Sequence, residues 1–315
     1  MSARNRANEI RISRVYDAPV TVVWNAFTDP EQVAQWWGPR GFTLTTHSKD
    51  LRPGGVWDYT MHGPDGIDYP NKTLYHEVEE YRKLVYDHGS ADDRPPLFRV
   101  TVLFSESEGK TTMEMSMALA SAEEAAATRK FIKEVGGNST WDRLAEHIDE
   151  TERGKHSFVI NRSFSAPVDQ VFDMWIDPVH LSNWLPPAGF DMTFLRADFR
   201  KGGDCFFRMS NGAGMAFYCR FDYREVAKPS RIVYRQTFCD ERENAAHHPG
   251  MPAFPVSMLT TVSFAAEGAR ETRVTVTSEL LSDASAGEVE AFRNTRSGMT
   301  QGWTGSLDKL EALLG

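Results

Sequence analysis

Asn71 and His88 are two polar residues that could do chemistry inside an apolar site. They fall on neighbouring predicted strands, near 67–78 and 83–88, and the alternation of side chains turns both toward one face. A histidine titrates near neutral pH, and an amide both donates and accepts hydrogen bonds. The pair could therefore orient a ligand or move a proton. The alternative is a histidine that is satisfied within the core or at its rim.

A second candidate lies in the second half of the chain, where Asp240 to Pro255 form an insertion that the first half lacks. It contains His247 and His248, close to Glu241 and Glu243. Such side chains bind metal ions, but adjacent histidines do not easily face one ion and no further histidine or cysteine spacing supports them. We therefore predict no metal, and interpret the insertion as a loop that overhangs a cavity.

Other catalytic and cofactor signatures fail on inspection. A histidine-glutamate pair at His76 begins like the helix of zinc peptidases but lacks the second histidine, and 212–214 is a lone GxG turn. The sequence has no GxSxG elbow and no P-loop. Cys205, Cys219 and Cys239 lack CxxC spacing, so we expect reduced core thiols. We predict no cofactor, and whether the chain is an enzyme stays open.

Composition narrows the class of protein. The chain has 315 residues, of which 41% are hydrophobic and 25% charged, as is typical of a soluble globular protein. A formal net charge of -9 argues against nucleic-acid binding, which needs concentrated basic residues. The sequence shows neither an apolar signal-peptide segment nor about 18 consecutive apolar residues. We therefore expect a cytoplasmic protein without membrane insertion.

The two halves of the chain are copies of one another. Residues 18–42 align with 166–190 at one constant offset and without a gap. The same offset aligns Gly54-Gly55 with Gly202-Gly203 further along. Such self-similarity indicates a tandem duplication of one fold. We predict two domains, at 8–150 and 156–315, joined by a short polar linker.

Each copy predicts the same order of elements. An alternating strand is followed by a helix start at Asp17 or Ser165, read as capping residues, and by a second short helix that Asp29 or Asp177 begins. A hairpin forms at the paired glycines, and one long helix closes each copy. The later strands are expected near 67–78, 83–88, 97–105 and 111–119, with counterparts near 215–226, 231–239, 257–265 and 271–280, and the closing helices at 121–150 and 284–314. This order predicts an α+β class.

Two glycines lie inside predicted helices, where glycine is an unfavourable residue. Gly136 and Gly298 occupy matching places inside the closing helices, where glycine costs roughly 0.8 to 1.0 kcal/mol relative to alanine. A bend, a close approach of the backbone to a ligand, or tight packing against an indole would explain them.

A set of residues in each copy carries a family resemblance. In the first copy the set comprises Pro19, Trp24, Asp29-Pro30, Trp36, Gly54-Gly55 and the segment from Gly136 to Trp141. Together they resemble the START-like, or SRPBCC, superfamily, and within it the domains related to the C-terminal domain of the activator of Hsp90 ATPase. The resemblance implies a helix-grip (START/Bet v 1-like) fold, in which a curved antiparallel sheet wraps a long C-terminal helix. It also implies a deep apolar cavity between sheet and helix.

Under this resemblance the inward-facing residues of the strands line the cavity. In the first copy they are Trp57, Tyr59, Met61, Tyr69, Asn71, Tyr75, Tyr86, His88, Met113, Met115 and Met117, and in the second Phe207, Met209, Phe217, Cys219, Phe221, Tyr223, Tyr234, Gln236 and Phe238. Aromatic rings and methionines dominate both sets, as in pockets for small molecules. The alternative is a filled core with no cavity.

The first hypothesis for function is binding of a hydrophobic or aromatic small molecule between sheet and closing helix. Specificity would come from Asn71 and His88 in one copy, and from Tyr223, Gln236 and the histidine insertion in the other. The resemblance also allows a cofactor-independent enzyme like the cyclases or hydrolases of the superfamily, or a protein-binding module like the Hsp90 activator. One copy could keep the pocket while the other serves as a structural partner.

Overall fold

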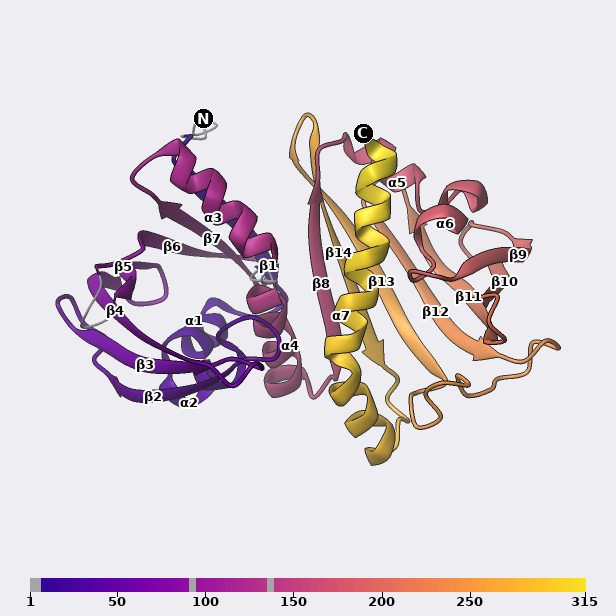
Figure 1. The fold of residues 1–315 in the computed structure, drawn as a ribbon, viewed down its shortest axis with the longest axis horizontal. Helices are drawn as coiled ribbons and strands as arrows, with labels where there is room; N and C mark the ends of the chain where they lie inside the picture. The colour runs from indigo at the N-terminus through magenta and orange to yellow at the C-terminus, as the bar shows by residue number, and fades with distance from the viewer. Residues whose placement is uncertain (1–6, 91–94, 135–138) are drawn as a thin grey trace. The chain divides into compact units, whose positions relative to one another are not determined.

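The computed structural model describes residues 7–90, 95–134 and 139–315. The chain divides into two compact units, Met1–Gly154 and Lys155–Gly315, called domain 1 and domain 2 below (Figure 1). Each contains a seven-stranded antiparallel sheet, two short helices after its first strand, and helical structure at its end. The predicted α+β class and the tandem helix-grip architecture are confirmed.

Domain 1 contains the first seven strands, in the spatial order β1-β7-β6-β5-β4-β3-β2. Its elements are β1 (Glu9–Tyr16), α1 (Val20–Thr28), α2 (Pro30–Trp36), β2 (Thr43–Lys49), β3 (Val56–His62), β4 (Asp68–Glu79), β5 (Lys83–Ser90), β6 (Phe98–Ser107), β7 (Lys110–Ala118), α3 (Ala122–Glu134) and α4 (Ser139–Arg153). One closing helix was expected here, whereas the structure has α3 and α4 on either side of 135–138. Gly136 lies outside the described residues.

Domain 2 repeats this order, with its sheet arranged β8-β14-β13-β12-β11-β10-β9. Its elements are β8 (Ser157–Phe164), α5 (Val168–Asp173), α6 (Pro178–Trp184), β9 (Asp191–Ala197), β10 (Asp204–Ser210), β11 (Ala216–Ala227), β12 (Arg231–Cys239), β13 (Ser257–Gly268), β14 (Glu271–Leu280) and α7 (Ala286–Leu314). A capping box of Ser285 and Glu288 starts α7, which crosses one face of the sheet (Figure 1). No described helix is long and apolar enough to cross a membrane.

The second short helix of each domain is fixed by the same two contacts. The Asp29 carboxylate accepts hydrogen bonds from two backbone N–H groups of α2, each at 2.9 Å, and Asp177 does the same for α6. The indole nitrogen of Trp36 donates to the Ala26 carbonyl at 2.9 Å, and that of Trp184 donates to Met174 at 2.9 Å. Both copies therefore place this helix identically against the core.

The first short helices begin differently from the prediction. Pro19 and Pro167 are the residues that precede α1 and α5, and neither forms a side-chain cap. The first N–H of α1, at Val20, donates to the Glu106 carboxylate at 2.8 Å. Asp17 instead forms ion pairs with Lys110 at 3.6 Å and Arg153 at 3.0 Å. Reading Asp17 and Ser165 as caps was wrong, because the helices begin after Pro19 and Pro167, which hold the capping positions two residues further on.

Tight packing, one of the three explanations predicted for Gly298, does not apply in the structure. A Cβ atom built on Gly298 would meet nothing within 4 Å, and α7 runs through this position as one helix of 29 residues. Gly302, one turn further on, also has nothing within 4 Å of an added Cβ. Neither glycine is therefore required by a close protein contact.

Replacing Gly298 by alanine should stabilise domain 2. We expect Gly298→Ala to raise the free energy of unfolding by roughly 1 kcal/mol, because alanine loses less backbone entropy in a helix. Equilibrium urea unfolding measures the change, and Gly302→Ala serves as the matched variant in the same helix. A loss of stability at Gly298 alone would mean that this position needs the backbone freedom of glycine.

Candidate functional site

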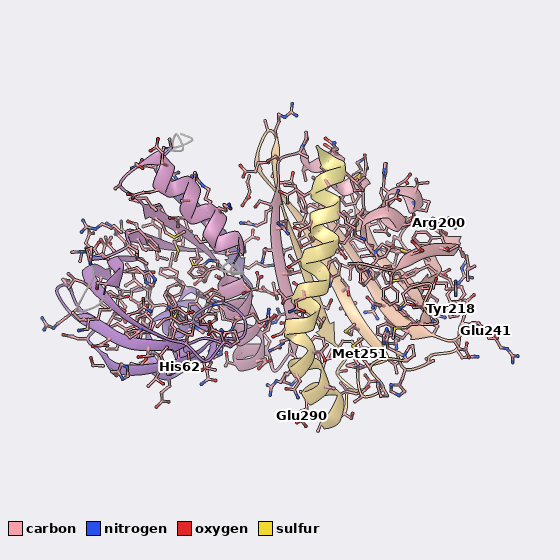
Figure 2. The ribbon with its side chains drawn as sticks, viewed as in Figure 1. His62, Arg200, Tyr218, Glu241, Met251 and Glu290 are labelled. Carbon is pink, nitrogen blue, oxygen red and sulfur yellow. The ribbon has the colours of Figure 1, made fainter. Side chains whose placement is uncertain are left out.

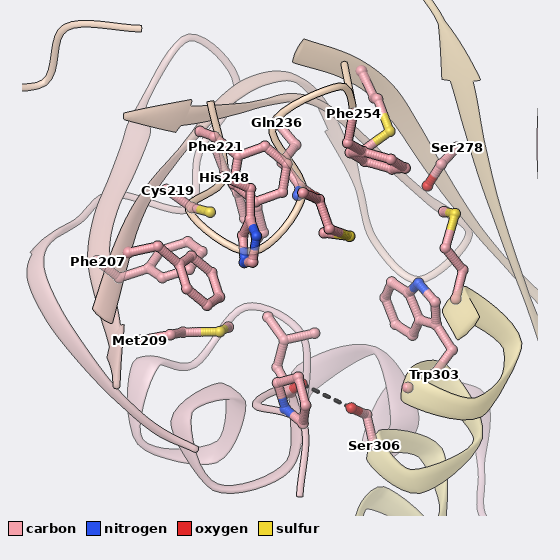
Figure 3. Close-up of a pocket in the computed structure, with 18 of the residues that line it drawn as sticks. Phe207, Met209, Cys219, Phe221, Gln236, His248, Phe254, Ser278, Trp303 and Ser306 are labelled. Carbon is pink, nitrogen blue, oxygen red and sulfur yellow. Dashed lines mark hydrogen bonds between the residues drawn. The ribbon is translucent and has the colours of Figure 1, made fainter. Parts of the chain in front are cut away.

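Domain 2 contains a partly open cavity of about 240 Å³ between its sheet and α7 (Figure 3). Four parts of the domain supply the wall: the strands, α7, the loop after α6, and the insertion between β12 and β13. The lining residues are Leu185, Pro187, Phe207, Met209, Phe217, Cys219, Phe221, Tyr234, Gln236, Phe238, His248, Met251, Phe254, Met258, Ser278, Met299, Gly302, Trp303 and Ser306. None of these side chains is a carboxylate, a lysine or an arginine.

The strand wall follows from the antiparallel register. Phe207 of β10 pairs with Cys219 of β11, and Phe221 pairs with Gln236 of β12. Directly paired residues point to the same face of a sheet, so their side chains form continuous rows. The rings pack closely, with centroids 4.8 Å apart for Phe207 and Phe221 and 4.2 Å for Phe221 and Tyr234. The result is a continuous aromatic wall.

The helix wall is one face of α7. Met299, Gly302, Trp303 and Ser306 follow the spacing i, i+3, i+4 and i+7, which places them on one side of a helix. The Ser306 hydroxyl donates to the Leu185 carbonyl at 2.8 Å, as the dashed line in Figure 3 shows. Lys309 donates to the Pro186 carbonyl beside it. These bonds tie α7 to the loop after α6 at one end of the cavity.

The insertion closes another side of the cavity. His248, Met251 and Phe254 line it, and Met251 lies near α7 whereas Glu241 lies far from that helix (Figure 2). The guanidinium of Arg196 on β9 holds Glu243 by two hydrogen bonds, at 2.8 and 2.7 Å. The backbone N–H of Ala246 donates to the Phe238 carbonyl, and the backbone N–H of Phe238 donates to the Val256 carbonyl. These two bonds hold the two ends of the insertion against β12. The insertion is therefore held in place beside the cavity, and we call it the strap below.

His248 is the polar residue of this strap. The backbone N–H of Gly250 donates to its Nδ1 at 3.1 Å, and burial lowers the pKa of His248 below its ordinary value. The imidazole is therefore neutral at pH 7 and carries its proton on Nε2. Its ring packs on Phe217 and Phe238, with centroids 4.4 and 5.2 Å away, and points into the cavity in Figure 3.

The other polar groups of the wall fall into two kinds. The hydroxyls of Ser278 and Thr260 bond each other at 3.2 Å, so these two groups are satisfied. Burial raises the pKa of the Cys219 thiol well above its ordinary value, so it stays protonated. Gln236 differs, because its half-buried amide has no hydrogen-bond partner among the residues that the structure describes.

Most of the strand residues predicted for domain 2 surround this cavity. Those that line it are Phe207, Met209, Phe217, Cys219, Phe221, Tyr234, Gln236 and Phe238. Tyr223 lies beside a separate void of about 10 Å³, and its hydroxyl bonds Cys205. Sequence reasoning did not assign the wall of α7, although the helical spacing of Met299 and Trp303 was visible. It named the insertion but not which of its side chains face the cavity.

In domain 1, tryptophans gather in the corresponding region. Trp37 aligns with Leu185 and Trp57 aligns with Cys205. The centroid of Trp37 lies 5.3 Å from Trp57, 6.3 Å from Trp141 and 6.2 Å from His88. Trp37, Trp57 and Trp141 are all buried. An indole, that of Trp37, thus stands where the wall of the domain 2 cavity has Leu185.

The residues predicted for domain 1 are distributed between core and surface. Those in its buried core are Trp57, Tyr59, Tyr75, Tyr86, Met113, Met115 and Met117, and Met61 packs against that core. The Tyr59 hydroxyl lies 3.4 Å from Nδ1 of His88, whose ring stacks on Phe98. Asn71 is buried and donates to the Tyr69 carbonyl at 2.8 Å, whereas the Tyr69 side chain is 37% exposed. The structure thus places Tyr69 at the surface.

Lys49 is a charged residue of domain 1 that sequence reasoning missed. Its Nζ donates to the Phe27 carbonyl at 3.2 Å and lies 4.2 Å from the centroid of the Trp57 ring. Burial lowers the pKa of Lys49 to about 7, and the Asp29 carboxylate offsets only part of that effect. Domain 2 has Ala197 at this position. Within the described residues, no group of histidine, cysteine or acidic side chains could hold a metal ion.

Comparisons with known proteins agree with the duplication. The family model described as Activator of Hsp90 ATPase homolog 1-like protein matches residues 17–149 and again 165–315. Among curated proteins, no sequence matches.

Solved structures resemble one domain or both. A protein from Arthrobacter aurescens is 26% identical, with a TM-score of 0.43 over 46% of this chain and 88% of its own. A protein from Chromobacterium violaceum is 25% identical, with a TM-score of 0.40 over 50% of this chain and 96% of its own. The di-domain ARO/CYC protein BexL is 14% identical, with a TM-score of 0.38 over 97% of this chain and 98% of its own.

The buried amine of Lys49 predicts a pH dependence for the stability of domain 1. Its pKa falls from 10.5 in the unfolded chain to about 7 in the folded domain. Between these values the unfolded chain binds a proton that the folded domain does not bind. The free energy of unfolding therefore falls as the pH is lowered from 10.5 to 7, and the loss is complete below about 7.

We expect Lys49→Met to be more stable than the wild type at pH 7, by on the order of 2 kcal/mol after the lost hydrogen bond to Phe27 is subtracted. The gain should shrink as the pH rises toward 10. Urea unfolding at pH 7 and pH 9.5 measures both values, with Lys110→Met at an exposed site as the control. An equal gain at both pH values would contradict the burial of a titrating amine.

Proposed function

Because this chain belongs to the activator of Hsp90 ATPase homolog 1-like family, we propose that its second domain binds a hydrophobic or aromatic small molecule beneath α7. The fold of this family is a ligand-binding fold. The observation that carries the proposal is the cavity of about 240 Å³, whose wall is built from aromatic rings and methionines. Mostly apolar walls with a few polar groups are typical of small-molecule sites.

Burial of apolar surface would supply the binding energy. A ligand with two aromatic rings hides roughly 250 Å² of surface, about as much as a tryptophan side chain. At about 25 cal/mol per Å², this transfer contributes about 6 kcal/mol. The costs of association reduce that value, so an affinity of tens of micromolar or weaker is expected. Polar contacts would add selectivity.

The two domains would then have different roles. Trp37 and Trp57 bring two indoles into the region where domain 2 has Leu185 and Cys205. In our proposal these rings fill the space that a ligand would need, so domain 1 serves as the structural partner. We also propose a cytoplasmic location, because the three cysteines of domain 2 are free and buried, as expected in a reducing compartment.

A cofactor-independent enzyme is the second candidate function. One observation favours it: His248 brings a neutral imidazole, which can accept and return a proton, to the wall of the cavity. Such an enzyme would convert its ligand instead of releasing it unchanged. Incubation of the protein with a bound aromatic compound, followed by mass analysis of that compound, separates the two functions.

Filling the cavity should abolish binding. We expect Leu185→Trp to weaken the binding of 2-naphthol at least tenfold, because the indole would occupy the cavity as Trp37 does in domain 1. Isothermal titration calorimetry measures the affinity, and Leu185→Met, which keeps the volume, should retain it. Trp37→Leu should leave the affinity of domain 2 unchanged. Equal binding by Leu185→Trp and wild type would place the ligand elsewhere.

A further inference from the structure

Two polar groups stand out on the cavity wall because the domain does not satisfy them. They are Nε2–H of His248 and the side-chain amide of Gln236, for which the described residues offer no hydrogen-bond partner. Both residues line the cavity. Both residues are half-buried, so water can bond these groups in the free protein, and a ligand that displaces this water loses affinity unless it makes the same hydrogen bonds.

The donor on His248 is held in place. Its Nδ1 accepts from the Gly250 N–H at 3.1 Å, which fixes both the tautomer and the direction of the ring. Phe217 and Phe238 pack against the ring edge-on. Arg196 fastens the strap through Glu243. The Nε2–H group is therefore held in one position before a ligand binds, which lowers the entropy cost of ordering it on binding.

Charge and size limit what can bind. None of the lining side chains is acidic or cationic at pH 7, so an ionised ligand would lose its hydration without gaining a counter-charge. A cavity of about 150 Å³ binds benzene in another protein. The present cavity of about 240 Å³ is larger by roughly half and suits two fused rings.

We propose that the cavity selects an uncharged bicyclic aromatic ligand with an oxygen atom that accepts the hydrogen bond of His248 Nε2–H. Gln236 provides the second polar contact, because its amide can donate or accept. The insertion between β12 and β13 is then the element that sets specificity. This inference rests on the proposed function of domain 2, and it names the chemical class of the ligand.

Three probes of one shape test the proposal: 2-naphthol, 2-methylnaphthalene and 2-naphthoate. The wild type should bind 2-naphthol about 5- to 10-fold more tightly than 2-methylnaphthalene, and 2-naphthoate most weakly. His248→Phe keeps an aromatic ring but removes the donor, so it should weaken 2-naphthol by about 5- to 10-fold and leave 2-methylnaphthalene within twofold. Calorimetric titration of the full-length chain gives each affinity.

Two further variants separate the loss of the hydrogen-bond donor from other effects of the substitution. His247→Phe alters the exposed neighbour of His248 and should change neither affinity. His248→Gln restores a donor and should recover part of the 2-naphthol affinity, and thermal unfolding checks that each variant folds. Equal weakening of both uncharged probes, or of neither, in His248→Phe overturns the inference but leaves the proposed function standing. Absence of binding by every probe in the wild type overturns both.

Discussion

The arrangement of each domain depends on its own stacked pair of aromatic rings. Trp303 of α7 stacks on Trp175 with centroids 6.1 Å apart, and Trp141 of α4 stacks on Phe27 at the same separation. The pair joins the closing helix to the short helical segment after the first strand, and this contact holds the helix over the sheet. The space between helix and sheet is then decided by the side chains beyond that contact. Leu185 lines the open cavity in domain 2, whereas Trp37 occupies the matching position of domain 1 and packs against Trp57 and Trp141.

Each domain joins its closing helix to the loop after its second short helix, and the two domains do so with different chemistry. In domain 1, Arg40 forms two hydrogen bonds to Glu146, at 2.9 and 2.8 Å, and Arg143 donates to several loop carbonyls. In domain 2, Ser306 and Lys309 donate directly to loop carbonyls. A buried ion pair loses hydration and tolerates little change in geometry. The domain with the open cavity therefore uses the less demanding connection.

The duplication made the strand wall predictable. A strand has a side-chain period of two, so the alternation around Phe207 and Phe221 already indicated which residues face the helix. Loops have no such period, and the position of His248 depends on its bond to Gly250 and on the strap that carries it. The exposure of Tyr69 was hidden for a related reason: it lies near the start of β4, where the alternation of residue types continues although the first three residues of the strand are all exposed. The difference between Trp37 and Leu185 was visible in the sequence, but only the structure shows that Leu185 lines a cavity whereas Trp37 packs against other tryptophans.

The decisive experiment is a crystal structure of the full-length chain with 2-naphthol. We predict one ligand between the sheet of domain 2 and α7, with its oxygen within hydrogen-bonding distance of His248 Nε2 and its rings against Phe221 and Trp303. Density for the ligand in domain 1 or on the surface, with the domain 2 cavity empty, would show that domain 2 does not hold the ligand.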